Sequence, residues 1–320
     1  MTEFAYESGR LNLPFVGHCT FAKAPVVLDW DAIDADFAVL GVPNDMGTQY
    51  RPGARFGPRG IREASTLFSF GHGGAYDHED GITYLPAERV RIVDLGDADI
   101  VHTDMSASHA NTEAAVRKIL AADATPVILG GDHSVHDPVM RAFAGASPIH
   151  IVQIDAHLDF VDERHGVRHG HGNPMRRSSE LEHVTGLTQL GIRNVSSSNV
   201  KDYEDARAAG STILSVRDVR RLGPEGVLAK IPIGPSYHIS IDIDGFDPSI
   251  APGTGTPSHG GFQYYEVLEI MRGLAYRGPV TGIDLVEVAP PYDPGGITSM
   301  LAAQLLMNML GYIFHARESR

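Results

Sequence analysis

The sequence predicts an α/β protein: a three-layer α/β/α sandwich whose central, mostly parallel sheet has about eight strands. Short runs rich in Val and Ile are continuously apolar, as expected for parallel strands that helices cover on both faces. Stretches with helical periodicity separate these runs, which gives a βαβ rhythm. No linker rich in Pro, Gly or Ser divides the 320 residues. We therefore expect a single domain over residues 1–320, with residues 1–35 as an N-terminal extension that lines the site entrance or an interface.

The expected elements alternate along the whole chain. The strands are Asp36–Val42, Val90–Leu95, Thr125–Leu129, Ile149–Ile154, Thr185–Gly191, Thr212–Val216, Tyr237–Ile243 and Val280–Val286. The helices are His109–Ala122, His136–Ala144, Asn199–Ala209, Arg217–Lys230, Tyr264–Tyr276 and Thr298–Ala316. Two segments rich in Gly and Pro, Arg51–Gly60 and Pro252–Gly261, are expected to be loops at strand ends, where functional loops belong.

Composition and charge exclude some partners. The net charge is −14, which argues against nucleic acid, because phosphate backbones favour basic surfaces. Such a charge either attracts cationic small molecules and metal ions or only keeps the protein soluble. The single cysteine, Cys19, forms no intrachain disulfide and no thiolate cage, which fits a reducing cytoplasm. We see no signal peptide and expect no apolar run long enough to span a bilayer, so a cytoplasmic protein without a membrane partner is predicted.

Three segments place acids and histidines directly after apolar runs: Gly130–Ser134, Asp155–Asp159 and Asp242–Pro248. Ligands of open parallel sheets bind just beyond the carboxyl ends of the strands, so the three segments are expected to meet there. On an extended backbone, side chains two residues apart point the same way, which would make the acids and histidines of each segment converge. Several carboxylates in one place repel one another unless cations lie among them.

The charge of this cluster suits two divalent cations. The candidate ligands are His133, Asp155, His157, Asp159, Asp242 and Asp244. Four carboxylates balance the charge of two such ions, and the imidazoles are neutral. Oxygen and imidazole ligands without sulfur favour Mn²⁺, while Ni²⁺, Co²⁺, Fe²⁺ and Zn²⁺ stay open. Paired metals generate a nucleophile near neutral pH, which indicates a hydrolase. We interpret Asp132 and Asp247 as loop and turn residues.

With these motifs the chain resembles the ureohydrolases, the arginase/agmatinase family, and is most similar to the agmatinase-like branch. The motifs are GGDHS at Gly130–Ser134, DAHLD at Asp155–Asp159, SIDIDGFDPS at Ser240–Ser249 and GIDLVEVAPPYDPGGITS at Gly282–Ser299. The resemblance runs from about residue 41 to the C-terminal helix and implies an arginase-like fold. It also implies that His133, Asp155, Asp159 and Asp242 hold one ion and Asp155, His157, Asp242 and Asp244 the other, with Asp155 and Asp242 bridging.

The resemblance further implies hydrolysis of a guanidino group by a metal-activated hydroxide, which releases urea and an amine. Glu287 matches the glutamate that pairs with the guanidinium, and Asp159 would align the hydroxide and pass a proton to the leaving nitrogen. His171 matches a proton-shuttle histidine that not every member retains. Agmatine is the first substrate expected, and a homotrimer or homohexamer is implied.

The tail of the substrate stays open. In the loop after Asp159, Asp162 and Glu163 suit a substrate with an amine tail. Arg164 and Arg168 suit a substrate with a carboxylate tail. A solvated surface loop whose charges pair with one another is an equally good interpretation. Guanidinobutyrate, guanidinopropionate, arginine and guanidine are therefore alternatives to agmatine. A single-zinc amide deacetylase and a catalytically silent partner subunit are alternatives of another class. The complete set of six ligands argues against both.

Overall fold

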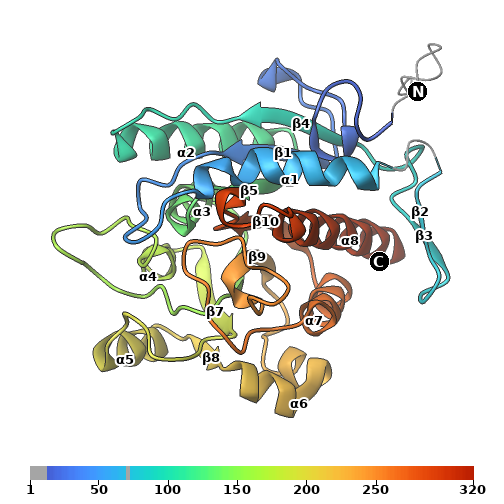
Figure 1. The fold of residues 1–320 in the computed structure, drawn as a ribbon. Helices are drawn as coiled ribbons and strands as arrows, with labels where there is room; N and C mark the ends of the chain where they lie inside the picture. Colours follow the sequence, from blue (N-terminus) through green and yellow to red (C-terminus); the bar gives the residue numbers. More distant parts are fainter. Residues whose placement is uncertain (1–12, 70–72) are drawn as a thin grey trace.

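The computed structural model describes residues 13–69 and 73–320, and eight of its strands form one sheet (Figure 1). These strands are β1 (Phe37–Val42), β4 (Ile92–Asp97), β5 (Thr125–Gly130), β6 (Ile149–Ile154), β7 (Val184–Leu190), β8 (Thr212–Leu214), β9 (Ser236–Asp242) and β10 (Val280–Val286). Their order is β4-β1-β5-β10-β9-β6-β7-β8, and every neighbouring pair is parallel. The predicted sheet is confirmed. Its last strand in sequence, β10, lies in the middle.

Helices cover both faces of the sheet, as the three-layer prediction requires (Figure 1). The helices are α1 (Gly57–Ser65), α2 (Met105–Ala121), α3 (His136–Ala142), α4 (Pro174–Ser179), α5 (Val200–Ala208), α6 (Val216–Leu228), α7 (Tyr264–Arg277) and α8 (Ile297–Ser319). Apolar side chains of α1, α6, α7 and α8 pack in one core layer. Those of α2, α3, α4 and α5 pack in the other.

The two core layers explain why the strands read as continuous apolar runs. Successive side chains of a strand point to opposite faces of the sheet. On β1, Val39 therefore packs in the layer with α8, and Leu40 packs in the layer with α2. Both side chains are fully buried. With a helix layer on each face, no position along the strand is left for a polar, solvent-facing residue.

The C-terminal helix corrects the expectation that no apolar run could span a bilayer. By length and composition, α8 (Ile297–Ser319) is long and apolar enough to do so. However, 78% of its most apolar window is buried against the rest of the described chain. Its side chains, such as Leu305 and Leu310, belong to the core layer formed with α1 and α7. The helix is apolar because it is buried on most of its circumference.

Two helices and two short strands escape the sequence-based prediction. Helix α1 occupies the second half of Arg51–Gly60, which was expected to be a loop. The glycine and proline there, Gly57 and Pro58, lie at the helix start, where proline fits because its missing N–H needs no partner. The short helix α4 and the hairpin of β2 (Ala75–Asp77) and β3 (Ile82–Tyr84) were not predicted either.

Part of the predicted N-terminal extension packs on the sheet edge. Phe21 is buried, and its backbone N–H donates to Asp94 Oδ2 at 2.8 Å. Arg62 of α1 binds the same carboxylate, with Nε 2.9 Å from Oδ2. Residues 1–12 of the extension lie outside the described residues. A role of the extension at the site entrance or an interface stays a prediction.

Candidate metal centre and active site

The three acidic segments meet at the carboxyl edge of the sheet. They follow β5, β6 and β9. The expected extended backbone is wrong for two of them. Strand β6 ends at Ile154, Asp159 has a left-handed φ of 51°, and Asp244 lies in the 3-10 turn Ile243–Gly245. The side chains converge because tight turns redirect them, and not because residues alternate along a strand.

The turn after β5 depends on a glycine. A Cβ on Gly131 would lie 1.7 Å from the carbonyl oxygen of Asn44, so no larger residue fits without moving the backbone. The carbonyl of Gly131 also accepts from the backbone N–H of Glu287 at 2.8 Å. The close packing at Gly131 therefore fixes His133, two residues further on, relative to the end of β10.

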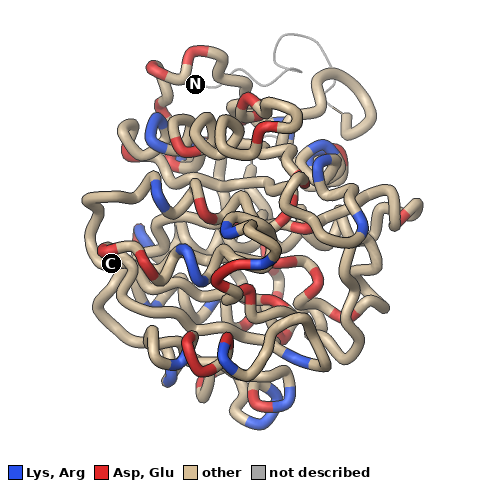
Figure 2. Tube along the Cα trace, turned by 90° about the vertical axis from the view of Figure 1, so that its left-hand side faces the viewer, with Lys and Arg blue, Asp and Glu red and all other residues tan. Residues whose placement is uncertain are grey.

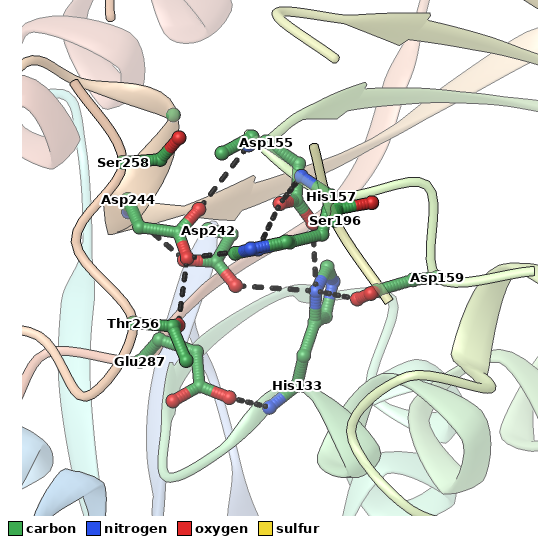
Figure 3. A network of polar contacts seen from close by, with 12 residues as sticks. His133, Asp155, His157, Asp159, Ser196, Asp242, Asp244, Thr256, Ser258 and Glu287 are labelled. Carbon is green, nitrogen blue, oxygen red and sulfur yellow. Dashed lines mark hydrogen bonds and ion pairs between the residues drawn. The ribbon is translucent and has the colours of Figure 1, made fainter. Parts of the chain in front are cut away.

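His133 faces three carboxylates, as dashed lines in Figure 3 show. Its Nδ1 lies 2.8 Å from Asp159 Oδ2, 3.1 Å from Asp155 Oδ2 and 3.5 Å from Asp242 Oδ2. All four side chains are buried. Atoms of His133, Asp155 and Asp242 lie close enough together to hold one metal ion.

The hydrogen bonds behind His133 define its tautomer. The hydroxyl of Ser240 donates its single proton to Asp284 Oδ1 at 2.6 Å. Ser240 Oγ must therefore accept from His133 Nε2, which lies 2.9 Å away. A neutral His133 then carries no proton on Nδ1, and this buried atom makes no hydrogen bond among the described residues. A bare nitrogen that faces carboxylates is the arrangement of a metal ligand.

A second group lies beside the first. His157 Nδ1 is 3.0 Å from Asp244 Oδ2 and 3.6 Å from Asp155 Oδ1. The hydroxyl of Thr256 donates to Asp244 Oδ2 at 2.9 Å, and the backbone N–H of Ala156 donates to Oδ1 at 3.2 Å. Asp155, His157 and Asp244 could hold a further ion. Because Asp155 belongs to both groups, the donor set fits two adjacent cations.

Burial and mutual repulsion perturb the acids. Burial, with the neighbouring charges of Asp244 and Asp155, raises the pKa of Asp242 well above its usual value. Burial and the charge of Asp155 raise the pKa of Asp159 to about 6. Burial also opposes ionisation of Asp155, but the neighbouring imidazoles of His133 and His157 outweigh it and lower that pKa. Cations placed among the carboxylates would relieve this repulsion.

Glu287 and His171 are next to the metal-ligand cluster and touch each other. Glu287 Oε1 accepts from the backbone N–H of His133 at 3.0 Å and lies 3.0 Å from His171 Nδ1. Burial alone lowers the pKa of His171, but the hydrogen bond with Glu287 and the charges of Glu287 and Asp132 raise it to about 9. Glu287, like Asp159, has a left-handed backbone, with φ 64°.

Sequence reasoning missed the polar residues that support His133. Asp284 lies on β10, with Oδ2 2.7 Å from His136 Nδ1 and 2.6 Å from His238 Nε2. All these side chains are fully buried. The available signal was the run of His238, Ser240 and Asp242 at alternate positions of an otherwise apolar strand, because buried polar residues need partners.

Asp132 and Asp247 have the supporting roles predicted for them. Asp132 accepts from the backbone N–H and the hydroxyl of Ser134 and from the hydroxyl of Thr48. Asp247 accepts from Ser249 and from the backbone N–H groups of residues 260 and 261. Neither carboxylate belongs to the candidate metal groups found among the described residues.

A parallel α/β sheet that gathers histidines and aspartates at its carboxyl edge has the architecture of a hydrolase with a candidate metal centre. The sequence profile of the arginase family matches residues 35–311. Human mitochondrial guanidino acid hydrolase is 39% identical over 92% of this chain and 82% of its own length. Chicken mitochondrial agmatinase is 37% identical over 92% of this chain and 85% of its own. The structure of proclavaminate amidino hydrolase from Streptomyces clavuligerus superposes with a TM-score of 0.83 at 33% identity, covering 95% and 99% of the two chains. This chain belongs to the arginase family.

The family defines the reaction class. The chain is a ureohydrolase, a hydrolase that acts on the C–N bonds of guanidino compounds. The family carries a binuclear manganese centre, and the residue groups around His133 and His157 are the candidates for it here. Both curated relatives above are called mitochondrial, so a cytoplasmic location stays a prediction.

Proposed function

We propose that this ureohydrolase binds two divalent cations and cleaves the guanidino group of a small substrate into urea and an amine. The six proposed ligands are His133, Asp155, His157, Asp159, Asp242 and Asp244. The position of His133 Nδ1, buried among the carboxylates of Asp155, Asp159 and Asp242, is the observation that carries this assignment. Mn²⁺ is the proposed metal because the donors are oxygen and imidazole. When bound, the cations supply Lewis acidity and lower the pKa of a water molecule.

The remaining residues would handle the substrate. Glu287 offers a buried carboxylate beside the ligands, suited to a guanidinium that brings its own positive charge. His171, whose Nδ1 lies 3.0 Å from Glu287 Oε1, would relay a proton between the substrate and solvent. Asp159, whose carboxylate borders His133 Nδ1, would orient the attacking water and pass a proton to the leaving nitrogen.

Urea release with defined metal content tests this function. The chain would be stripped with chelator, reloaded with Mn²⁺ or Ni²⁺, and assayed on agmatine, guanidinobutyrate, guanidinopropionate, arginine and guanidine. Agmatine, the substrate first expected, is one member of this panel. We expect two metal ions per chain and urea from at least one compound. One zinc ion per chain without urea release would favour the amide deacetylase reading.

The oligomeric state belongs to the same proposal. We expect a homotrimer or homohexamer. Exposed apolar side chains such as Phe15, Leu28 and Ile297 supply surface for contacts between copies. The mass in solution, from sedimentation or light scattering, checks this. A monomeric mass at micromolar concentration would contradict it.

A further inference from the structure

We propose that the substrate carries a carboxylate tail and that Arg164 binds it, which makes this ureohydrolase a guanidino acid hydrolase. The inference rests on the proposed function, since Arg164 would act on the tail of a substrate whose guanidinium is at the metal centre. The loop between Asp159 and α4 contains acids and arginines, and the sequence alone does not choose between them. The ion pairs of these residues in the structure distinguish between them.

The acids of this loop are poorly placed to bind an amine. Asp162 Oδ1 lies 2.6 Å from Arg177 Nη2 and 3.0 Å from Arg168 Nη2, so two guanidinium groups already neutralise it. Arg177 is almost fully buried, which holds one side of the pair in place, while the Asp162 side chain stays about half exposed, at 49%. Glu163 is exposed, where water screens its charge. An amine tail would have to displace Arg168 or bind a solvated carboxylate.

Arg164 differs because only neutral groups hold it. Its Nη1 donates to Gln49 Oε1 at 3.0 Å, and its Nη2 donates to the carbonyl of Ser197 at 2.8 Å. No Asp or Glu carboxylate within the described ranges forms an ion pair with it. A guanidinium has five N–H donors, so three remain for a carboxylate. Charge-assisted, bidentate binding of a carboxylate is what arginine geometry favours.

Contacts place Arg164 next to the groups proposed to act on the substrate. The backbone N–H of Gln49, whose side chain holds Arg164, lies 3.3 Å from His171 Nε2. His171 in turn contacts Glu287. Ser197, the other anchor, follows Ser196, which is drawn with the metal ligands in Figure 3. Arg164 therefore bridges two loops that border the centre.

The loop holds Arg164 in a defined position. Its backbone N–H and carbonyl both pair with Val167 at 2.9 Å, which closes a tight turn at the loop tip. The turn uses left-handed residues, His165 with φ 53° and Gly166 with φ 83°. This loop projects at the left of Figure 1, and Figure 2 views that face, where acidic and basic positions lie close together near the middle. A fixed guanidinium loses little entropy on binding.

The cavity beside Arg164 has one arginine without an ion-pair partner among the described residues. It has a volume of about 980 Å³ and lies between the loop 46–49, the loop 164–170 and α2. Three arginines line it, Arg141, Arg164 and Arg168, against one acid, Glu113. Arg141 is paired with Glu113 at 2.9 Å and with Asp137 at 2.7 Å, and Arg168 is paired with Asp162 at 3.0 Å. Arg164 is therefore the arginine of this lining whose charge is left to attract a carboxylate and to repel a diamine such as protonated agmatine.

Urea release from two substrates of similar length tests the proposal: guanidinobutyrate, which ends in a carboxylate, and agmatine, which ends in an amine. With Mn²⁺-loaded protein we expect a higher kcat/KM for guanidinobutyrate. Arg164→Met should lower that value about 10- to 100-fold, mainly through KM, because one charge-assisted contact is lost. Arg164→Lys should keep part of the preference. Inhibition by butyrate, which has the carboxylate but no guanidinium, should weaken in Arg164→Met.

Arg221→Met is the matched control, because it removes the same charge from an exposed arginine of α6 that pairs with Asp218. Metal content and the thermal midpoint show whether each variant is folded and loaded. If wild-type protein releases urea from no guanidino compound, the proposed function fails. If it hydrolyses agmatine at least as well as guanidinobutyrate, or if Arg164→Met leaves both kcat/KM and butyrate inhibition unchanged, the tail assignment alone is overturned.

Discussion

At the scale of single residues, the orientation of His133 rests on one hydroxyl. Ser240 accepts from His133 Nε2 and donates to Asp284, so it turns Nδ1 toward the carboxylates. We expect Ser240→Ala to weaken Mn²⁺ affinity about 10- to 100-fold, as for other groups that orient a ligating histidine. Calorimetric titration of chelator-stripped protein measures this.

Ser249→Ala provides the comparison for that prediction. Ser249 is an exposed serine whose hydroxyl donates to Asp247 in a surface turn. The substitution should leave metal affinity unchanged. Equal affinities for Ser240→Ala and wild type would show that the hydroxyl does not orient the ligand.

The carboxylate of Glu287 supports a second prediction. Glu287→Gln keeps the size of the side chain but removes the charge that would meet the guanidinium. A buried partner of a charged group contributes about 2–5 kcal/mol, so kcat/KM for urea release should fall about 30-fold or more. Metal content should stay at the wild-type value, because Glu287 is not among the proposed ligands. Retention of full activity would remove Glu287 from the substrate site.

At the scale of elements, the turn from β5 to the 3-10 turn His133–Val135 tolerates no side chain at Gly131. Gly131→Ala would force a Cβ into the backbone of Asn44, and we expect it to lower the free energy of unfolding by about 2–4 kcal/mol. Urea denaturation measures the loss. Gly295→Ala is the control, since a Cβ there meets only ordinary contacts at 3.6 Å and beyond, and it should be close to neutral.

His150 on β6 should make the stability of the fold depend on pH. Burial lowers the pKa of His150 from 6.5 to about 4, and its Nε2 lies 2.9 Å from Thr188 Oγ1 on β7. Between pH 6.5 and 4, His150 is therefore protonated in the unfolded chain but neutral in the folded chain. The free energy of unfolding, which is highest above pH 6.5 for this group, should fall by roughly 3 kcal/mol as the pH drops to 4.

The variant His150→Gln isolates this effect from other titrating groups. Its free energy of unfolding should lose about 3 kcal/mol less than that of wild type between pH 7 and pH 4. His102→Gln, at an exposed histidine, should follow the wild-type curve. Parallel curves for wild type and His150→Gln would mean that His150 is protonated in the folded chain.

At the scale of the whole molecule, the metal centre joins turns after β5, β6 and β9. Ions that bind only the folded chain stabilise it by about 2.7 kcal/mol per site at 100 times the dissociation constant. We expect chelation to lower the thermal midpoint by roughly 5 °C or more and Mn²⁺ to restore it. Asp155→Asn, which alters the carboxylate shared by both groups, should respond much less to Mn²⁺. A midpoint unaffected by chelation would contradict the centre.

The sequence predicted the sheet well because continuous apolar runs indicate burial on both faces, which holds fully for β1, β5 and β6 and only in part for the edge strands β4 and β8. It predicted six of the eight helices. It missed α1, since Gly57 and Pro58 were interpreted as loop residues although they start a helix. The candidate ligands do converge, but the turns that redirect Asp159 and Asp244 depend on backbone conformation, which residue types do not reveal. Asp162 forms an ion pair with Arg168, whereas Arg164 binds the neutral side chain of Gln49, and this difference likewise depends on contacts of the folded chain.

The position of β10 has a consequence for biosynthesis. This strand is the last to be made, yet it lies between β5 and β9 and separates β4-β1-β5 from β9-β6-β7-β8. On the ribosome, a nascent chain that ends before residue 280 holds two half-sheets with no strand to join them. His133 and Glu287, which are 154 positions apart, come into contact only after β10 inserts. Such distant pairing is slow, so the centre forms only after residues 280–287 have been made, and a chain that stops before β10 would expose the unpaired edges of β5 and β9 to aggregation.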